Sequence, residues 1–148
     1  MFNYFFDTDR IGHADAVRMF EAIGRGEYEG YTSEYVVLEL RRAPEPKRSN
    51  MLALIEKYSI ILLEPGDKTD RLANIYLHEK ALPARSVYDS THIASATVNR
   101  LDCVLSFNCQ HINRDTTKER VAVINKREGY RSVWICKPEE VLENERIQ

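Results

Sequence analysis

Short apolar segments alternate with helical segments along this chain, and this alternation constrains the fold more than any other feature. Segments with the length and composition of strands lie at residues 29–32, 59–64, 102–106 and 132–136. The second of them, Ser59-Ile-Ile-Leu-Leu-Glu64, is expected to be a buried strand. Strands separated by helices are typical of α/β proteins with a mostly parallel sheet. The sequence therefore predicts an α/β sandwich built on such a sheet.

Residues that cap or break helices set the bounds of the segments between these strands. Gly24 and Gly26 end the first helix, and Gly129 stops the sixth. Ser33 and Ser86 are expected as N-caps of the second and fifth helices. Prolines terminate the second helix and lie near the first turn of the last one. The predicted helices cover about residues 14–23, 33–42, 47–57, 68–80, 87–100, 116–128 and 137–143.

Length and charge restrict the possible classes of protein. A chain of 148 residues suits one domain, and no repeat, low-complexity tract or long linker divides it. We therefore predict a single domain over residues 1–148. The 21 lysines and arginines and 23 acidic residues give a net charge of −2. This charge argues against a strong attraction of the whole molecule to nucleic acid, but it allows a local basic patch.

Cysteine usage and hydropathy indicate the compartment. The three cysteines, Cys103, Cys109 and Cys136, are an odd number and form no C-x-x-C pair. Neither a disulfide framework nor a cysteine zinc site is expected, and a reducing cytosol is the predicted location. No apolar run approaches the length of a membrane span, and the opening MFNYFF lacks the features of a signal peptide. The expectation is a cytoplasmic protein without a membrane partner.

Acidic side chains near the carboxyl ends of strands are the first candidates for a functional site, because ligands bind at that edge of parallel sheets. Glu39 lies among the apolar residues Val36, Val37 and Leu40, and is expected to border the buried face of its helix. A surface glutamate whose stem lies on apolar surface is the alternative.

Asp89 is the second candidate, near the first turn of the predicted helix Y-D-S-T-H-I-A-S-A-T. Small residues in this helix allow close packing against its neighbours. His92 lies three residues later, on the same side, where it could orient the carboxylate or contact a phosphate. The simpler interpretations are that Asp89 stabilises a helix N-terminus and that His92 is a packed polar residue.

The loop L-S-F-N-C-Q-H-I-N follows a predicted strand and carries the third group of candidates. Ser106, Asn108, Gln110 and His111 lie where a strand delivers side chains to the edge of the sheet. An amide at this edge could hydrogen-bond a metal-bound water or a phosphate.

The three elements T-S-E-Y-V-V-L-E-L-R-R-A-P, V-Y-D-S-T-H-I-A-S-A-T and D-C-V-L-S-F-N-C-Q-H-I together resemble the PIN domain family. The similarity is greatest to the VapC-type ribonuclease toxins of prokaryotic toxin–antitoxin pairs, and it covers nearly the whole chain. The most specific part is the D-S-T-H-I-A helix followed by a strand and S-F-N-x-x-H-I. The resemblance implies a three-layer sandwich in which helices flank a mostly parallel sheet.

The resemblance also implies an activity and a set of partners. In the family, acidic residues gather around Mg²⁺ or Mn²⁺, and a metal-activated water cleaves RNA phosphodiesters. Glu39 and Asp89 would be the metal ligands, and Asn108, where many relatives carry Asp, would hold water or phosphate. A hard divalent cation prefers such oxygen ligands and keeps several waters. The implied partners are an RNA substrate, a cognate antitoxin and a second copy in a homodimer.

The family's first acid, which ends its first and central strand, has two possible positions. F-F-D-T offers Asp7 for this role. Relatives of this subgroup, however, read D-T-S-V-F-x-Y-F-F-D, so that MFNYFFD matches the part after the acid. The short separation of 32 positions between Asp7 and Glu39 favours the second alignment, in which the first strand lies upstream of Met1. In the other alternative, MFNYFF replaces that strand and Asp7 substitutes for the acid.

Two other functions are compatible with the sequence. With one acid missing and Asn at position 108, the chain could be a catalytically dead PIN-like module that binds RNA or an antitoxin. F-F-D-T-D also resembles the D-x-D motif of haloacid-dehalogenase-type phosphatases, in which the first Asp attacks phosphate. The acidic segment G-D-K-T-D lies in the wrong place for that class, which makes it the weaker alternative.

Overall fold

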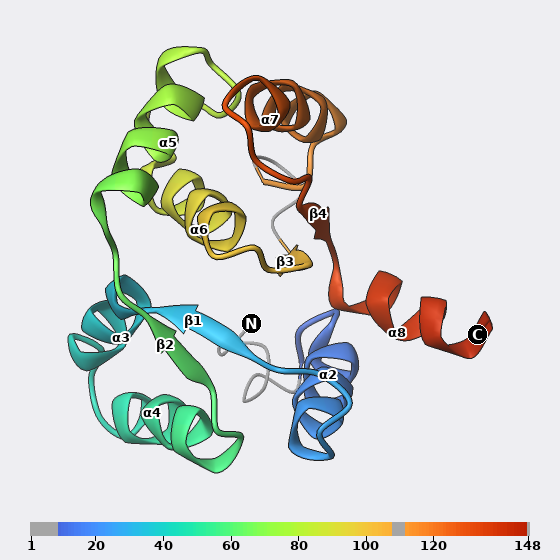
Figure 1. The fold of residues 1–148 in the computed structure, drawn as a ribbon. Helices are drawn as coiled ribbons and strands as arrows, with labels where there is room; N and C mark the ends of the chain where they lie inside the picture. Colours follow the sequence, from blue (N-terminus) through green and yellow to red (C-terminus); the bar gives the residue numbers. More distant parts are fainter. Residues whose placement is uncertain (1–8, 108–111, 148) are drawn as a thin grey trace. The chain divides into compact units, whose positions relative to one another are not determined.

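The computed structural model describes residues 9–107 and 112–147, and these form helices and short parallel strands (Figure 1). The predicted α/β class is confirmed. The chain divides into two compact units, Met1–Glu64 and Pro65–Gln148, and each contains one pair of strands. The three-layer sandwich and the single domain over residues 1–148 remain predictions.

The first unit consists of three helices and two strands among its described residues. They are α2 (His13–Gly24), β1 (Tyr31–Ser33), α3 (Glu34–Arg41), α4 (Lys47–Lys57) and β2 (Ile61–Leu63). Buried apolar side chains from the three helices form its interior: Ala16, Met19, Phe20, Ala22, Val37, Met51 and Leu54.

Glycines set both ends of α2. Gly12 precedes the helix with a φ of 101°, in the left-handed region that favours glycine. Gly24 is the last helical residue and Gly26 follows with a φ of 77°, which confirms the predicted end of the helix. A Cβ on Gly24 would lie 3.1 Å from the ring of Tyr58, and that ring packs against Phe20 at 5.3 Å. The glycine therefore lets the end of α2 approach Tyr58 closely.

Strands β1 and β2 pair in parallel, with Tyr31 opposite Ile61 and Ser33 opposite Leu63. The prediction that residues 59–64 form a buried strand is wrong for two side chains, since Ile61 and Leu62 are each 43% exposed. A parallel strand is buried only where other elements cover both of its faces. The described residues of the first unit leave these two side chains uncovered.

The second unit contains four helices and two strands among its described residues. They are α5 (Asp67–His78), α6 (Val87–Val98), β3 (Cys103–Leu105), α7 (Asp115–Arg127), β4 (Trp134–Cys136) and α8 (Pro138–Ile147). Strands β3 and β4 pair in parallel, with Val104 opposite Ile135. Gly129 follows α7 with a φ of 83° and confirms the predicted stop.

The core of the second unit lies among α5, α6, α7 and the strand pair. Its members are Leu72, Ala73, Tyr76, Ala81, Leu82, Ile93, Ala94, Ile112, Val121, Ile124 and Ile135. Helices α5 and α6 supply five of these side chains, so α6, which carries Asp89, is packed into this core.

The two predicted serine N-caps behave differently. Ser33 precedes α3, and its Oγ accepts a hydrogen bond from the backbone N–H of Val36 at 3.4 Å, which confirms the predicted cap. Ser86 precedes α6, but its side chain makes no capping hydrogen bond. The prediction that the side chain of Ser86 caps α6 is therefore wrong, although the helix begins at Val87 as expected.

Candidate functional site

Asp89 lies in the first turn of α6, and its side chain is half-buried. The first turn of a helix carries N–H groups without helical partners and a partial positive charge, which stabilise an ionised carboxylate. Because Ser86 does not cap these N–H groups with its side chain, Asp89 is the acidic residue of this turn that can interact with them. The structure thus gives a local reason for a carboxylate at this position, as the sequence suggested.

The rotation of α6 about its own axis is fixed by Ser90. Its side chain is fully buried, and its Oγ donates a hydrogen bond to the backbone carbonyl of Ala73 in α5 at 2.7 Å. This contact brings two helix backbones close together, which only small side chains such as Ser90, Ala73 and Ala94 permit. Successive residues are about 100° apart around a helix. The contact of Ser90 with α5 therefore also sets the direction in which Asp89 leaves α6.

His92 lies one turn after Asp89 on α6 and is half-buried. The spacing of three residues puts the two side chains on the same side of the helix. The buried face consists of Ile93, Ala94 and other neighbours, so His92 is not a member of the core. It is well placed to act on a group that Asp89 binds, and this role is still a prediction.

Glu39 lies in the last turns of α3, and its side chain is exposed. The expectation that it borders the buried face of its helix is wrong. Helix α3 buries Val37, and a residue two positions later lies about 200° further around the helix. Glu39 is therefore a hydrated carboxylate, accessible to a cation that keeps its own water shell.

Glu39 belongs to the first unit and Asp89 to the second, and their shared role as metal ligands stays a prediction. Carboxylate oxygens are the ligands that Mg²⁺ prefers, and this ion is held by one or two carboxylates together with waters and substrate phosphates. Within residues 9–107 and 112–147, no three His, Cys, Asp or Glu side chains gather as a metal-binding group. The donor chemistry fits a divalent cation, and the shared site is a hypothesis.

The loop after β3 is closed at its base by two hydrogen bonds. The backbone N–H of Ser106 donates to the carbonyl of Cys136 at 3.0 Å and so extends the pairing with β4. The side-chain amide of Asn113 donates to the carbonyl of Ser106 at 2.5 Å. These contacts join the two ends of the loop that carries the predicted residues. Asn108, Gln110 and His111 lie outside the described residues, as does Asp7.

Asn113 is a residue that sequence reasoning missed. Its Oδ1 is buried and has no hydrogen-bond partner among the described residues. A buried acceptor without a donor is costly and usually has a structural or functional reason. The sequence offered only its position at the end of the polar loop, which does not separate it from Asn108.

Two thiols face each other beside this loop. Cys103 on β3 and Cys136 on β4 lie on the same face of adjacent parallel strands, two residues apart in register. A hydrogen bond between the two thiols lowers the pKa of Cys103 and raises that of Cys136. Cys103 is therefore the more acidic of the two and loses its proton first.

Comparisons of the chain with protein-family models, with curated proteins and with solved structures find no match. Among the helices that the structure describes, each is too short or too polar to cross a membrane.

Proposed function

We propose that this chain is a metal-dependent endoribonuclease of the PIN/VapC toxin type that cleaves RNA phosphodiesters. The observation that carries the proposal is the position of Asp89. It is half-buried in the first turn of α6, on a helix that is fixed against α5 and followed directly by β3. This is the strand–helix context that the resemblance requires for a catalytic carboxylate before the loop with Asn108.

The remaining elements support the same proposal. Glu39 lies on the helix that follows β1, and β1 and β3 each pair in parallel with one strand. Parallel pairing is the strand arrangement that the proposed family sheet requires. The three-layer arrangement is part of the proposal.

Each residue has a separate role in the proposed reaction. Glu39 and Asp89 bind Mg²⁺ or Mn²⁺ through carboxylate oxygens, and Asn108 orients water or a phosphate oxygen. When bound, the divalent cation lowers the pKa of water and stabilises negative charge on the phosphoryl group. His92 contacts a phosphate or orients Asp89. The proposed partners are the RNA substrate, a cognate antitoxin that inserts a segment into the acidic site, and a second copy of the chain, in the cytoplasm.

The test is RNA cleavage with Mg²⁺ or Mn²⁺, with excess EDTA, and with three purified variants. Asp89→Asn and Glu39→Gln should each reduce the cleavage rate by about 10²- to 10³-fold, because each removes a charge that acts in the transition state. Asp70→Asn is the matched control, since Asp70 is an exposed acid in the first turn of α5. It should cleave like the wild type. Metal-dependent cleavage that survives both site substitutions would show that the assigned acids are wrong.

A non-catalytic binding module is the second candidate. It is favoured by the asparagine at position 108, where many relatives of the family carry Asp. Such a protein would bind RNA or an antitoxin and would show no metal-dependent cleavage. A D-x-D phosphatase would instead hydrolyse p-nitrophenyl phosphate and lose that activity in Asp7→Asn.

A further inference from the structure

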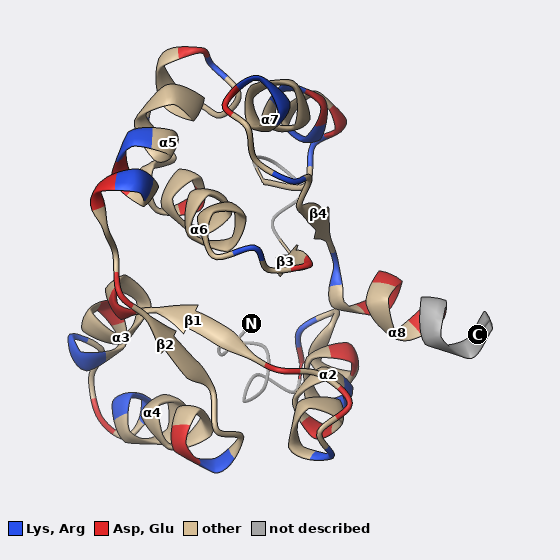
Figure 2. Cartoon of the chain, viewed as in Figure 1, with Lys and Arg blue, Asp and Glu red and all other residues tan. Residues whose placement is uncertain are grey.

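Positive charge is concentrated at the junction of α3 and α4. Residues 41–48 carry four cations and one carboxylate, a net charge of +3 in a chain whose net charge is −2. We call Arg41, Arg42, Lys47 and Arg48 the cationic corner. Figure 2 shows its two blue segments at the end of α3 and at the start of α4. The first unit therefore has a local basic surface, although the net charge of the whole chain is negative.

The side chains of the cationic corner are exposed, and most of them are not neutralised by the protein. Arg48 donates a hydrogen bond to Glu45 at 2.7 Å. Ion pairs of Arg41, Arg42 or Lys47 are absent from the described part of the chain. Three positive charges at this corner thus face solvent.

Local helix stability explains only half of this arrangement. Arg41 lies in the last turn of α3 and Arg42 is its C-cap, where the helix dipole favours cations. Lys47 and Arg48 open α4, where the dipole opposes cations, and no acidic residue lies in that first turn. Arg48 is compensated by its ion pair with Glu45, so Lys47 is the cation of the corner that stands unpaired where the helix dipole opposes it. A bound polyanion would relieve this repulsion.

The composition of the corner selects the type of polyanion. Residues 41–50 read RRAPEPKRSN and contain no aromatic or large aliphatic side chain. Within these ten residues a peptide partner would find no apolar anchor of the kind that dominates protein–protein affinity, and the exposed apolar side chain that precedes them on α3 is Leu38, at 50% exposure. A phosphate backbone needs only cations, and arginine forks bind phosphate oxygens with two hydrogen bonds.

We propose that the cationic corner binds the phosphate backbone of single-stranded RNA. The exposed charges alone support this binding surface. Its role in binding the substrate of the nuclease rests on the proposed function. Glu39 and Arg42 are three residues apart on α3, which is about 4.5 Å along the helix axis. A strand held by Arg42 would therefore pass beside the candidate metal ligand Glu39, and the corner would position the RNA next to the site.

The experiment is a fluorescence-anisotropy titration of a fluorescein-labelled oligouridine over a range of salt concentrations, in EDTA so that cleavage does not occur. The variant Arg41→Gln/Arg42→Gln/Lys47→Gln removes three exposed charges. It should bind about tenfold or more weakly at low salt, and the slope of log K against log salt should fall by about 2. Circular dichroism of the same sample checks that the variant is folded.

The matched control removes three exposed charges elsewhere, in Lys68→Gln/Arg71→Gln/Lys126→Gln. It should keep the wild-type slope. An equal loss in the control would show that only total charge matters, and this would overturn the proposal. Failure of the wild type to bind oligouridine, or preferential binding of polyglutamate, would overturn it too.

The two proposals fail independently. A salt slope that falls as expected, without any metal-dependent cleavage, leaves the cationic corner standing and rejects the nuclease. If cleavage depends on Asp89 but the salt slope of the corner variant is unchanged, the nuclease stands and the cationic corner is rejected.

Discussion

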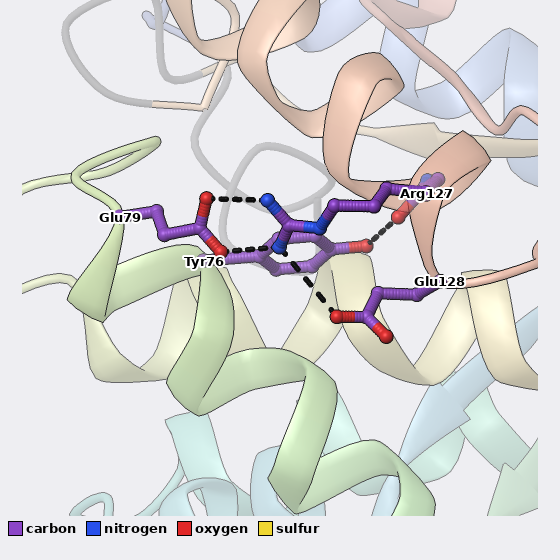
Figure 3. A network of polar contacts seen from close by, with 5 residues as sticks. Tyr76, Glu79, Arg127 and Glu128 are labelled. Atoms are coloured by element: carbon purple, nitrogen blue, oxygen red, sulfur yellow. Dashed lines mark hydrogen bonds and ion pairs between the residues drawn. The ribbon is translucent and has the colours of Figure 1, made fainter.

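The hydroxyl of Tyr76 on α5 donates a hydrogen bond to the side-chain carbonyl of Asn125 on α7, 49 positions later in the chain. Both residues are almost fully buried, at 0% and 1% exposure. The amide of Asn125 also donates to the hydroxyl of Thr97 on α6 at 3.4 Å. Three helices of the second unit are thus joined through one buried polar cluster, close to the surface ion pair seen in Figure 3.

Tyr76→Phe should destabilise the second unit by about 1–3 kcal/mol, because it leaves the buried oxygen of Asn125 without its donor. Urea denaturation at pH 7, followed by circular dichroism, measures this change. Tyr88→Phe is the control, since Tyr88 is 56% exposed and its hydroxyl is not part of the cluster. Equal unfolding midpoints for Tyr76→Phe and the wild type would contradict the cluster's role.

The ion pair between Glu79 and Arg127 links the end of α5 to α7 at the surface. It should contribute much less to the free energy of unfolding than the buried cluster. Arg127 donates two hydrogen bonds to the carboxylate of Glu79 and also approaches Glu128 (Figure 3). The hydrogen bond from Arg127 lowers the pKa of Glu79, so its stabilisation is present above the unfolded pKa and lost on acidification. Because the pair is exposed, water and salt screen it. Glu79→Gln should therefore shift the urea midpoint at pH 7 far less than Tyr76→Phe.

Burial raises the pKa of Tyr76 from 10.0 to about 12. In the unfolded chain this hydroxyl ionises near pH 10, whereas in the folded chain it stays protonated until about pH 12. The contribution of the raised pKa to the free energy of unfolding is therefore complete below pH 10. It is lost as the pH rises from 10 to about 12. The stability difference between the wild type and Tyr76→Phe should shrink by up to about 2–3 kcal/mol between pH 9 and 12. A constant difference over this range would mean that Tyr76 is not protected from ionisation. Tyr88→Phe is the control for the ionisation of an exposed tyrosine, and its stability difference from the wild type should stay constant over the same pH range.

Helix positions could be predicted from the sequence because glycine, proline and serine act locally. Gly24, Gly129 and Ser33 fix helix ends through their own backbone or hydroxyl, and the structure agrees at each. Strand burial depends on what covers the strand. Ile61 and Leu62 are apolar, but their exposure is decided by elements that the local pattern does not describe.

The candidate site shows the same division between local and tertiary information. The first-turn position of Asp89 followed from the helix pattern, because the helix start is local. For Glu39 the sequence left two alternatives open, and the structure agrees with the surface glutamate, since α3 buries Val37 where the apolar pattern suggested a wider buried face. The roles of Ser90 and Asn113 depend on carbonyl groups 17 and 7 positions away, so no local pattern reveals them.

Ser90 should tolerate removal of its hydroxyl better than an increase in size. Ser90→Ala loses one hydrogen bond to the carbonyl of Ala73, at a cost of about 0.5–1.5 kcal/mol. Ser90→Val places extra methyl groups in a fully buried contact between helices, which costs about 1–3 kcal/mol and moves α6 away from α5. Thr91→Val, which removes a hydrogen bond within α6, is the control. RNA cleavage should fall most in Ser90→Val, because Asp89 moves with the helix. Equal cleavage by all three variants would mean that the contact with α5 does not position Asp89.

Two substitutions of Asn113 test its hydrogen bond to Ser106 at the base of the loop. Asn113→Ala removes the donor to Ser106 together with the buried oxygen that has no partner among the described residues, so its two effects partly cancel. Asn113→Asp keeps the size but directs a carboxylate at the carbonyl of Ser106. It should therefore be less stable than Asn113→Ala at pH 7. Acidification to about pH 4 should narrow the gap, since protonation restores a donor at this position. Urea denaturation at both pH values measures the effect. Greater stability of Asn113→Asp at pH 7 would show that the hydrogen bond to Ser106 does not hold the loop.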